Sequence, residues 1–242
     1  MAGAPVSEYS ISGGRKWLEN LADPSTPSGW AAEGIYFDAD WSAIWLTLAK
    51  LRSVVVPAHW VVWWRFLRHN VMTANRTAHM IEGGSSDCHH CLYDGAEGVV
   101  QTPGHLLVGC SSSFGLWRKV LNVSVGDGGL LGLHLVPRCL LPFLFLDHRG
   151  VSQEWCALTH SVALWVLMAA HWGVVFDDLH HRFTTDSLWG SWKALVLALV
   201  QGRWWHARRH QNFDTFDRLW ISGSQGTLVR TLVGVGWKVG IG

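Results

Sequence analysis

Apolar residues recur at intervals of three and four over most of the chain, which is the period of an α-helix. In the first half this period covers 41–52 and then about 59–71, where Pro57 suits the first helical turn. A third helix is expected after the serines at 111–113, which can cap it. The residues expected on the buried sides of these helices are Trp41, Ile44, Trp45, Leu48 and Leu51; Trp60, Trp64, Leu67 and Val71; and Phe114, Trp117, Val120 and Leu121.

The helical period continues in the second half, after a glycine-rich run at 126–129. One helix is expected over 152–172, and because it is apolar on nearly every side, it needs cover on most of them. Another is expected from about 185 to Arg209, with Gly202 as a candidate kink. The residues expected to face inward are Trp155, Leu158, Val162, Trp165, Val166 and Ala169 in the first, and Leu188, Trp192, Leu195 and Leu199 in the second.

The two ends of the chain differ from this helical body. Residues 1–40 are rich in Gly, Pro and Ser, so we expect a loosely ordered segment from which Trp17 or Trp30 docks on the body. Apolar residues alternate through the last part of the chain, from Val229 to Val239, which is typical of a β-strand. Its expected partner is either the segment 130–146 or another chain.

Composition restricts the classes of function. The 242 residues carry a net charge of +1 and only 15% are charged, whereas nucleic-acid-binding modules commonly have a basic excess. This balance argues against strong independent binding to nucleic acid. One segment, 157–176, has the length of a membrane span but contains His160 and His171, so we expect a buried helix and no membrane partner.

The spacing of cysteines and histidines predicts a metal site. Cys88, Cys91, His105 and Cys110 form a C-x2-C-x13-H-x4-C pattern, and Cys₃His is a common ligand set for structural Zn²⁺. The alternatives are a disulfide between two of the cysteines or a reduced thiol cluster without metal. His89 and His90, inside the C-x2-C turn, are expected to point to solvent.

Cysteine usage also bears on the compartment. No apolar run follows the first residues, so we expect no secretory signal. Five cysteines in such a chain favour metal over disulfides in a reducing compartment, and the expected localisation is intracellular, nuclear or cytoplasmic.

An ordered set of motifs surrounds the proposed ligands. It comprises Trp41-x3-Trp45, the run from Trp63 to Arg76, Cys88-x2-Cys91, the run Gln101-Thr102-Pro103-Gly104-His105-Leu106-Leu107-x2-Cys110, and Trp117-Arg118. Over residues 41–121 this order resembles the zinc-binding domain that lies C-terminal to the reverse transcriptase in non-LTR (LINE-type) retrotransposons. The resemblance implies a role in holding template RNA or target DNA near the polymerase, with a reverse-transcriptase-bearing chain as a partner. No Tyr/Phe-x-Asp-Asp polymerase motif occurs, so we expect only the tail of such an element.

Two groups of basic residues are candidates for contact with RNA or DNA. The densest lies at 203–210, where Arg203, Arg208 and Arg209 could contact phosphates while Trp204 or Trp205 stacks on a base. The alternative is the solvated end of a helix, whose cations suit the negative end of the dipole. The second group would form a rim around the zinc loop or ordinary surface charge, and consists of Arg65, Arg68, Arg76 and Arg118.

We therefore predict a mainly α protein with a small Cys₃His zinc-binding module and a short C-terminal β-strand. The expected parts are a loosely ordered segment at 1–40, the zinc-binding module at 41–123, an irregular linker at 124–150, a helical region at 151–222 and a strand-like tail at 223–242. No G-x-S-x-G, H-E-x-x-H or phosphate-binding glycine loop occurs, so an enzyme is not expected. The expected function is a non-catalytic, nucleic-acid-associated zinc protein. The alternative is an interaction protein in which zinc only clamps the fold and the Trp-rich surface docks on a protein or membrane.

Overall fold

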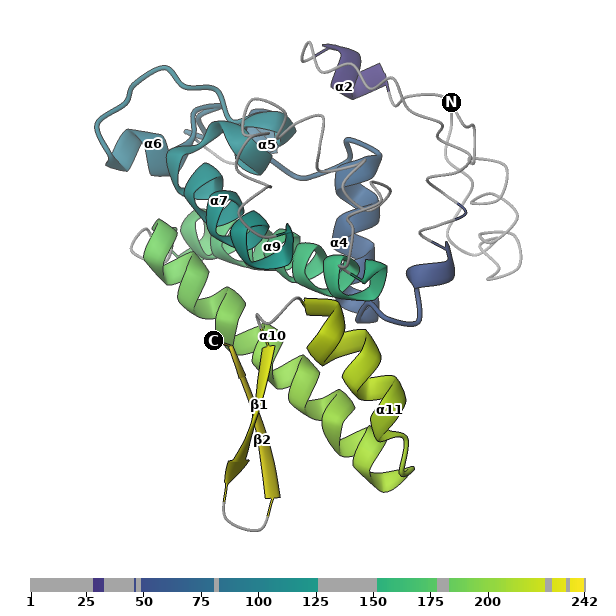
Figure 1. Ribbon diagram of the computed structural model, residues 1–242. Coiled ribbons are helices and arrows are strands. Elements are labelled where there is room, and N and C mark those ends of the chain that lie inside the picture. Colours follow the sequence, from purple (N-terminus) through teal and green to yellow (C-terminus); the bar gives the residue numbers. More distant parts are fainter. Residues whose placement is uncertain are drawn as a thin grey trace.

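The computed structural model describes residues 28–32, 46, 49–80, 83–125, 152–177, 183–224, 228–233 and 236–241, and these residues are mainly helical (Figure 1). The longer helices are α4 (Pro57–Leu67), α7 (Ser111–Val125), α9 (Gln153–Asp177) and α10 (Thr185–Arg209). The shorter helices and turns are α2 (Ser28–Ala32), α5 (Ala74–Thr77), η2 (Ala78–Met80), α6 (His89–Tyr93), η3 (His105–Gly109), α11 (Phe213–Phe216), η7 (Asp217–Ile221) and η8 (Ser222–Ser224). The predicted fold class is thereby confirmed.

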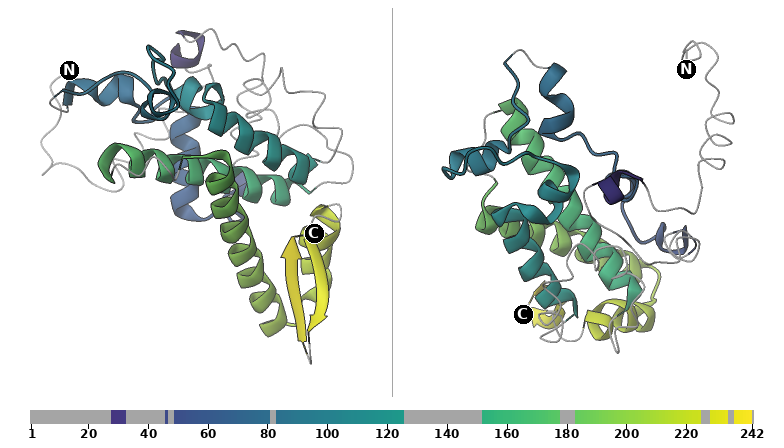
Figure 2. Two further views of the ribbon diagram at one scale, coloured as in Figure 1. Left: turned by 90° about the vertical axis from the view of Figure 1, so that its left-hand side faces the viewer. Right: turned by 90° about the horizontal axis from the view of Figure 1, so that it is seen from above.

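Helix α9 is the centre of the fold, and α4, α7 and α10 all pack on it (Figures 1 and 2). The Ser152 hydroxyl caps it by accepting a 3.0 Å hydrogen bond from the Trp155 N–H, as the sequence predicts. It ends at Asp177, five residues later than expected, and Ala169 is exposed although it was expected to face inward. Within the described part of the chain, α9 is the one helix long and apolar enough to cross a membrane. Two thirds of its most apolar window is buried inside the protein.

Helices before and after the linker share one hydrophobic core. Trp117 of α7, Trp155 of α9 and Trp192 of α10 are all fully buried. The Trp192 indole also donates a 2.9 Å hydrogen bond to the Thr159 carbonyl, which ties α10 to α9. Phe114 is more than one third exposed, contrary to expectation, and Ser113 takes a fully buried place on α7 instead.

Helix α4 has Pro57 in its first turn, as predicted, but it ends at Leu67 rather than near Val71. The helix stops because His69 adopts a left-handed backbone conformation, with φ of 53°. Trp30 of α2 docks at this end, as expected, and its indole donates a 3.2 Å hydrogen bond to the Leu67 carbonyl. Gly29 permits this approach, since a Cβ there would lie 2.1 Å from Nδ1 of His69. Of the helix expected over 41–52, the described residues 46 and 49–51 are helical, and the others lie outside the described residues.

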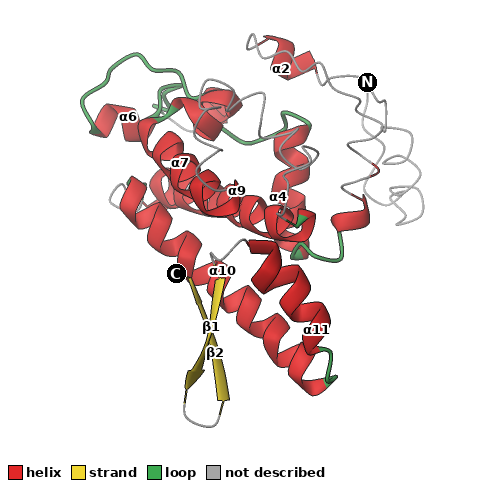
Figure 3. Cartoon of the chain, in the orientation of Figure 1, coloured by secondary structure: helices red, strands yellow, loops and turns green. Residues whose placement is uncertain are grey.

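Helix α10 is capped by Thr184, whose hydroxyl accepts from the Ser187 N–H at 3.3 Å, and it runs through Gly202 without interruption. The expected strand at the C-terminus is in fact two strands, β1 (Leu228–Val233) and β2 (Gly236–Ile241), paired with each other as an antiparallel hairpin (Figure 3). Leu228 pairs with Ile241, and Val233 with Gly236. The expectation of a partner elsewhere was therefore wrong. The segment 130–146 and most of the predicted linker lie outside the described residues, and the predicted part boundaries stay predictions.

Candidate metal centre

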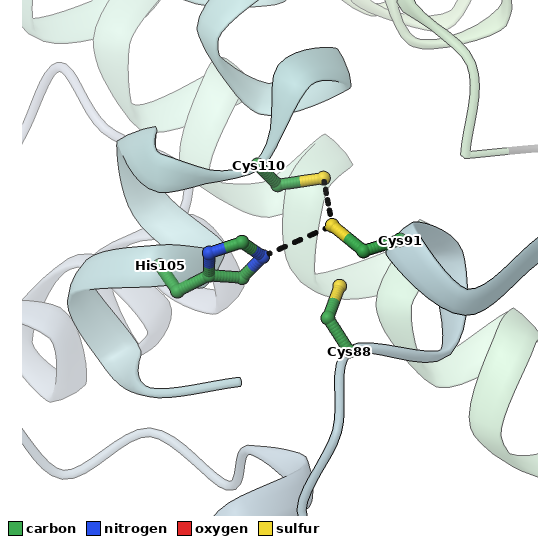
Figure 4. Close-up of side chains that lie close together, drawn as sticks. All are labelled: Cys88, Cys91, His105 and Cys110. Carbon is green, nitrogen blue, oxygen red and sulfur yellow. Dashed lines mark hydrogen bonds between the residues drawn. The ribbon is translucent and has the colours of Figure 1, made fainter. Parts of the chain in front are cut away.

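The four predicted ligands come from two short turns that meet beneath α7 (Figure 4). Cys88 is the N-cap of α6 and Cys91 lies within that helix. His105 opens the π-helical turn η3, and Cys110 ends it, immediately before α7 begins. In Figure 4 the side chains of Cys91, His105 and Cys110 point toward one another, and the Cys88 sulfur approaches from the side of α6.

The ligand atoms converge. The three sulfurs and one imidazole nitrogen all lie within 4.8 Å of one another. Cys91 Sγ lies 3.4 Å from His105 Nε2 and 4.0 Å from Cys110 Sγ. All three cysteines are buried and free, so the disulfide alternative is not what the structure shows. The arrangement is that of a metal-ion site with four protein ligands.

Backbone pairing fixes the first ligand pair. The Cys88 N–H donates to the Val99 carbonyl at 2.7 Å, and an isolated bridge joins Asp87 to Val100. This short antiparallel contact closes the loop that carries the cysteine pair. Gln101, at its end, is buried, and its amide nitrogen lies 3.6 Å from Cys88 Sγ as a donor. Its amide oxygen accepts from the Ala74 N–H at 2.9 Å, so Gln101 connects the centre to α5.

Helix α7 holds the second ligand pair in place. The His105 N–H donates to the Thr102 hydroxyl at 3.0 Å, and the Cys110 N–H donates to the His105 carbonyl at 2.8 Å. The Trp117 indole donates to the Leu107 carbonyl at 2.8 Å, and the Ser113 hydroxyl to the Leu106 carbonyl at 2.7 Å. These bonds satisfy carbonyl groups that the irregular π turn leaves free, and they fix the turn against the core.

Electrostatics within the cluster favour a cation. The hydrogen bond between Cys110 and Cys88 lowers the pKa of the Cys88 thiol far below its ordinary value. The same hydrogen bond, together with burial, raises the pKa of Cys110, and burial raises the pKa of Cys91 to about 11. Without a metal ion, the surrounding protein groups therefore favour the thiolate form of Cys88 and disfavour the thiolate forms of Cys91 and Cys110. A bound metal ion would remove that opposition, because thiolates rather than thiols bind metals.

His90 does not point to solvent as expected. It is buried, its Nε2 lies 2.7 Å from the Ser112 hydroxyl, and its ring contacts Phe183 at a centroid distance of 5.0 Å. Asp94 Oδ2 lies 3.3 Å from the same nitrogen. His90 thus joins α6 to the start of α7 and to the segment before α10. It is a structural residue that the sequence pattern did not reveal, because its partner lies 22 positions away.

The basic residues expected around the zinc loop divide into two kinds. Arg65 on α4 and Arg118 on α7 are exposed. Arg76 is half-buried and donates to the Val71 carbonyl at 3.3 Å, with His69 Nδ1 at 2.9 Å. Arg68 is half-buried, with its guanidinium 5.7 Å from the centre of the Trp64 ring. Two of the four arginines are therefore engaged within the protein.

The end of α10 also differs from expectation. Trp204 is buried and packs against Phe213 and Phe216, at centroid distances of 5.4 and 5.3 Å, so it cannot stack on a base. The guanidinium of Arg203 donates to the Val54 carbonyl and lies 4.8 Å from the Trp220 ring, which makes it a structural contact. The exposed residues here are Trp205, His206, Arg208, Arg209 and His210.

No family model matches the chain, and no curated protein or solved structure matches it. Function is therefore inferred from geometric and chemical features of the chain's own residues. The best defined of these is the convergence of Cys88, Cys91, His105 and Cys110.

Proposed function

We propose that the chain is a non-catalytic zinc-binding segment that associates with nucleic acid, similar to the tail of a non-LTR retrotransposon reverse transcriptase. The observation that carries the proposal is the convergence of three cysteine sulfurs and one histidine nitrogen between α6 and α7. The ligand order along the chain is also the order on which the resemblance rests.

The distances support zinc. In a tetrahedral site with Zn–S bonds of about 2.3 Å and Zn–N bonds of about 2.0–2.1 Å, two sulfurs lie about 3.8 Å apart, and a sulfur and a nitrogen about 3.5 Å apart. The corresponding distances from Cys91 are 4.0 Å to the Cys110 sulfur and 3.4 Å to the His105 nitrogen. Four protein ligands leave no position for a water or a substrate, which is the pattern of structural zinc sites. Zinc would supply folding free energy by holding the two ligand-bearing turns together.

Association with nucleic acid is supported by the exposed arginines. Arg118 lies on α7, which packs on the turn η3 of the zinc loop, Arg65 lies on α4, and Arg208 and Arg209 lie at the end of α10. Guanidinium groups contact phosphates without regard to sequence, so these positions suit a role in holding a strand rather than reading it.

A second candidate function is favoured by apolar residues on the surface of the zinc module. Met80, Tyr93 and Val100 are 65%, 67% and 46% exposed. Where exposed apolar side chains form a contiguous patch, that patch is typical of a protein docking surface. In this alternative, zinc only clamps the fold, and the module binds a protein partner.

Metal analysis of the purified full chain tests the proposal. We expect one zinc per chain, lost in Cys88→Ser and Cys110→Ser. Cys156→Ser is the matched control, since Cys156 is also a buried, free cysteine but lies in α9 outside the cluster. Zinc retained in both ligand variants would refute the assignment.

Binding to single-stranded RNA then separates the two functions. A nucleic-acid-associated protein loses affinity steeply as salt rises, because counterions compete for the phosphates. The absence of any salt-dependent binding by the zinc-loaded chain would refute nucleic-acid association and favour the docking alternative.

A further inference from the structure

The last turns of α10 carry an exposed tryptophan among arginines. Trp205 is 60% exposed, whereas its neighbour Trp204 is 5% exposed and belongs to the core. The Arg208 guanidinium lies 5.2 Å from the centre of the Trp205 ring. Residues 205, 208 and 209 fall within an arc of about 100° on a helix, so their side chains share one face. All three residues are exposed, so this face of α10 does not pack against another described element.

The charge of this face is positive. Among the described residues, neither Arg208 nor Arg209 forms an ion pair with an acidic side chain. Arg218, on the turn that follows, is also exposed, and the acidic residues of the same stretch are Asp214 and Asp217. Two arginines with exposed guanidinium groups are therefore available to an anionic partner.

Helix-dipole stabilisation accounts for only part of this arrangement. Arginines at the C-terminus of a helix do interact favourably with its negative end. That effect gives no reason for an indole to be exposed beside them. A large exposed aromatic ring next to guanidinium groups is the combination that binds unpaired bases and their phosphates together.

We infer that Trp205, Arg208 and Arg209 form a binding site for single-stranded nucleic acid, in which Trp205 stacks on an unpaired base and the two arginines contact the adjacent phosphates. The inference rests on the proposed association with nucleic acid, and it places the contact at the end of α10 rather than on the zinc module. A base within a duplex offers no free face to the indole, so the site selects single strands. Stacking and phosphate contacts carry little sequence information, so the site accepts RNA or DNA of many sequences.

The test is fluorescence anisotropy of a labelled oligouridylate with the full zinc-loaded chain at several salt concentrations. Trp205→Ala should weaken binding about tenfold or more, while the dependence of affinity on salt stays unchanged. The double variant Arg208→Ala/Arg209→Ala should instead lower the slope of log K against log salt by about 1.4, the value for two phosphate contacts to a single strand. Trp205→Phe should retain most of the affinity, because phenylalanine also offers a ring for stacking.

Two matched controls come from the zinc module. Tyr93→Ala removes an aromatic side chain of similar exposure, and Lys50→Ala/Arg52→Ala removes two exposed basic side chains that have no proposed role in binding. Neither should change the affinity or the salt slope as the α10 variants do. The zinc content and thermal unfolding of each variant show that it is folded. The same oligouridylate paired with oligoadenylate should bind at least tenfold more weakly than the single strand.

The outcomes separate this inference from the proposal on which it rests. Loss of binding in Arg65→Ala/Arg118→Ala, with Trp205→Ala unchanged, would overturn the α10 site and leave nucleic-acid association intact. No binding of the wild-type chain to any strand would overturn both. Equal affinity for the duplex would overturn the stacking role. A third outcome is that the wild-type chain binds anionic phosphatidylserine vesicles but not oligouridylate, and that Trp205→Ala no longer binds the vesicles. That result would identify the face as a membrane contact instead.

Discussion

His171 makes the stability of the fold depend on pH. This histidine lies in α9 and is buried, and its Nε2 donates a 3.1 Å hydrogen bond to the Met72 carbonyl. The bond joins the central helix to the segment between α4 and α5, which leads to the metal centre. Burial lowers the pKa of His171 to about 4, because the charged imidazolium would lose its hydration, although the bond to Met72 opposes the shift.

The sign and size of the effect follow from linkage. The folded protein binds the proton more weakly than the unfolded chain, in which a histidine has a pKa of about 6.5. The stability due to neutral His171 is therefore complete above about pH 6.5 and is lost as the pH falls from there toward 4. With these two pKa values, the loss at pH 5 is about 2 kcal/mol, and most of it occurs between pH 6.5 and 5.

The assay is urea denaturation of the wild-type chain and His171→Gln, monitored by circular dichroism. The pH is varied from about 7.5 to about 5, the range in which linkage predicts most of the loss. Glutamine keeps a donor for the Met72 carbonyl but does not titrate. The free energy of unfolding of the wild type should fall by about 2 kcal/mol more than that of the variant. Acid also weakens metal binding, but both chains carry the same ligands, so that loss cancels in the difference.

His210→Gln is the matched control, because it makes the same replacement at an exposed histidine. Parallel stability curves for the wild type and His171→Gln would refute the reasoning. They would mean that His171 is hydrated in the folded protein or that its bond to Met72 offsets the cost of burial.

Two further predictions concern packing. Gly202→Ala should stabilise the protein by about 0.5–1 kcal/mol, since Gly202 lies inside α10 and a Cβ there meets nothing within 4 Å; thermal unfolding measures this, and destabilisation would show that the α10 surface is covered. Trp192→Phe should lower the free energy of unfolding by about 1 kcal/mol more than Trp155→Phe does. The Trp192 indole donates to the Thr159 carbonyl, whereas the equally buried Trp155 indole has no hydrogen-bond partner among the described residues. Equal losses in urea denaturation would contradict this.

Local signals in the sequence were enough to predict the long helices and the metal ligands. The period of apolar residues together with a capping serine predicted the start of α9, and α10 begins at Thr185, the position expected from the sequence. The ligand set is encoded by spacing, because a C-x2-C turn and an H-x4-C turn can each present two donors on one side. These features depend on residues a few positions apart.

Three features that the period of apolar residues does not encode were missed. The strand pattern continues past residues 234 and 235 without a break, so it indicated one strand, although Gly234 and Gly236 are residues that a tight turn uses. The end of α4 depends on the φ angle of His69, which the apolar pattern does not encode. His90 is buried because Ser112 and Phe183 surround it, and neither is near it in sequence.

Trp204 and Trp205 show what a closer use of the helical period would have revealed. The buried row of α10 repeats every four residues, through Trp192, Val196, Val200 and Trp204. Continuing that row from Trp192 places Trp204 in the core and Trp205 on the surface. Basic neighbours indicated contact with nucleic acid for both tryptophans, and only the burial pattern distinguishes them.

Zinc X-ray absorption spectroscopy of the metal-loaded chain measures the ligand shell of the metal itself. Coordination by Cys88, Cys91, His105 and Cys110 predicts three sulfurs at about 2.3 Å and one nitrogen at about 2.0–2.1 Å from a single ion. A shell of oxygen and nitrogen alone, or fewer than three sulfurs, would show that the metal binds elsewhere and would contradict the account.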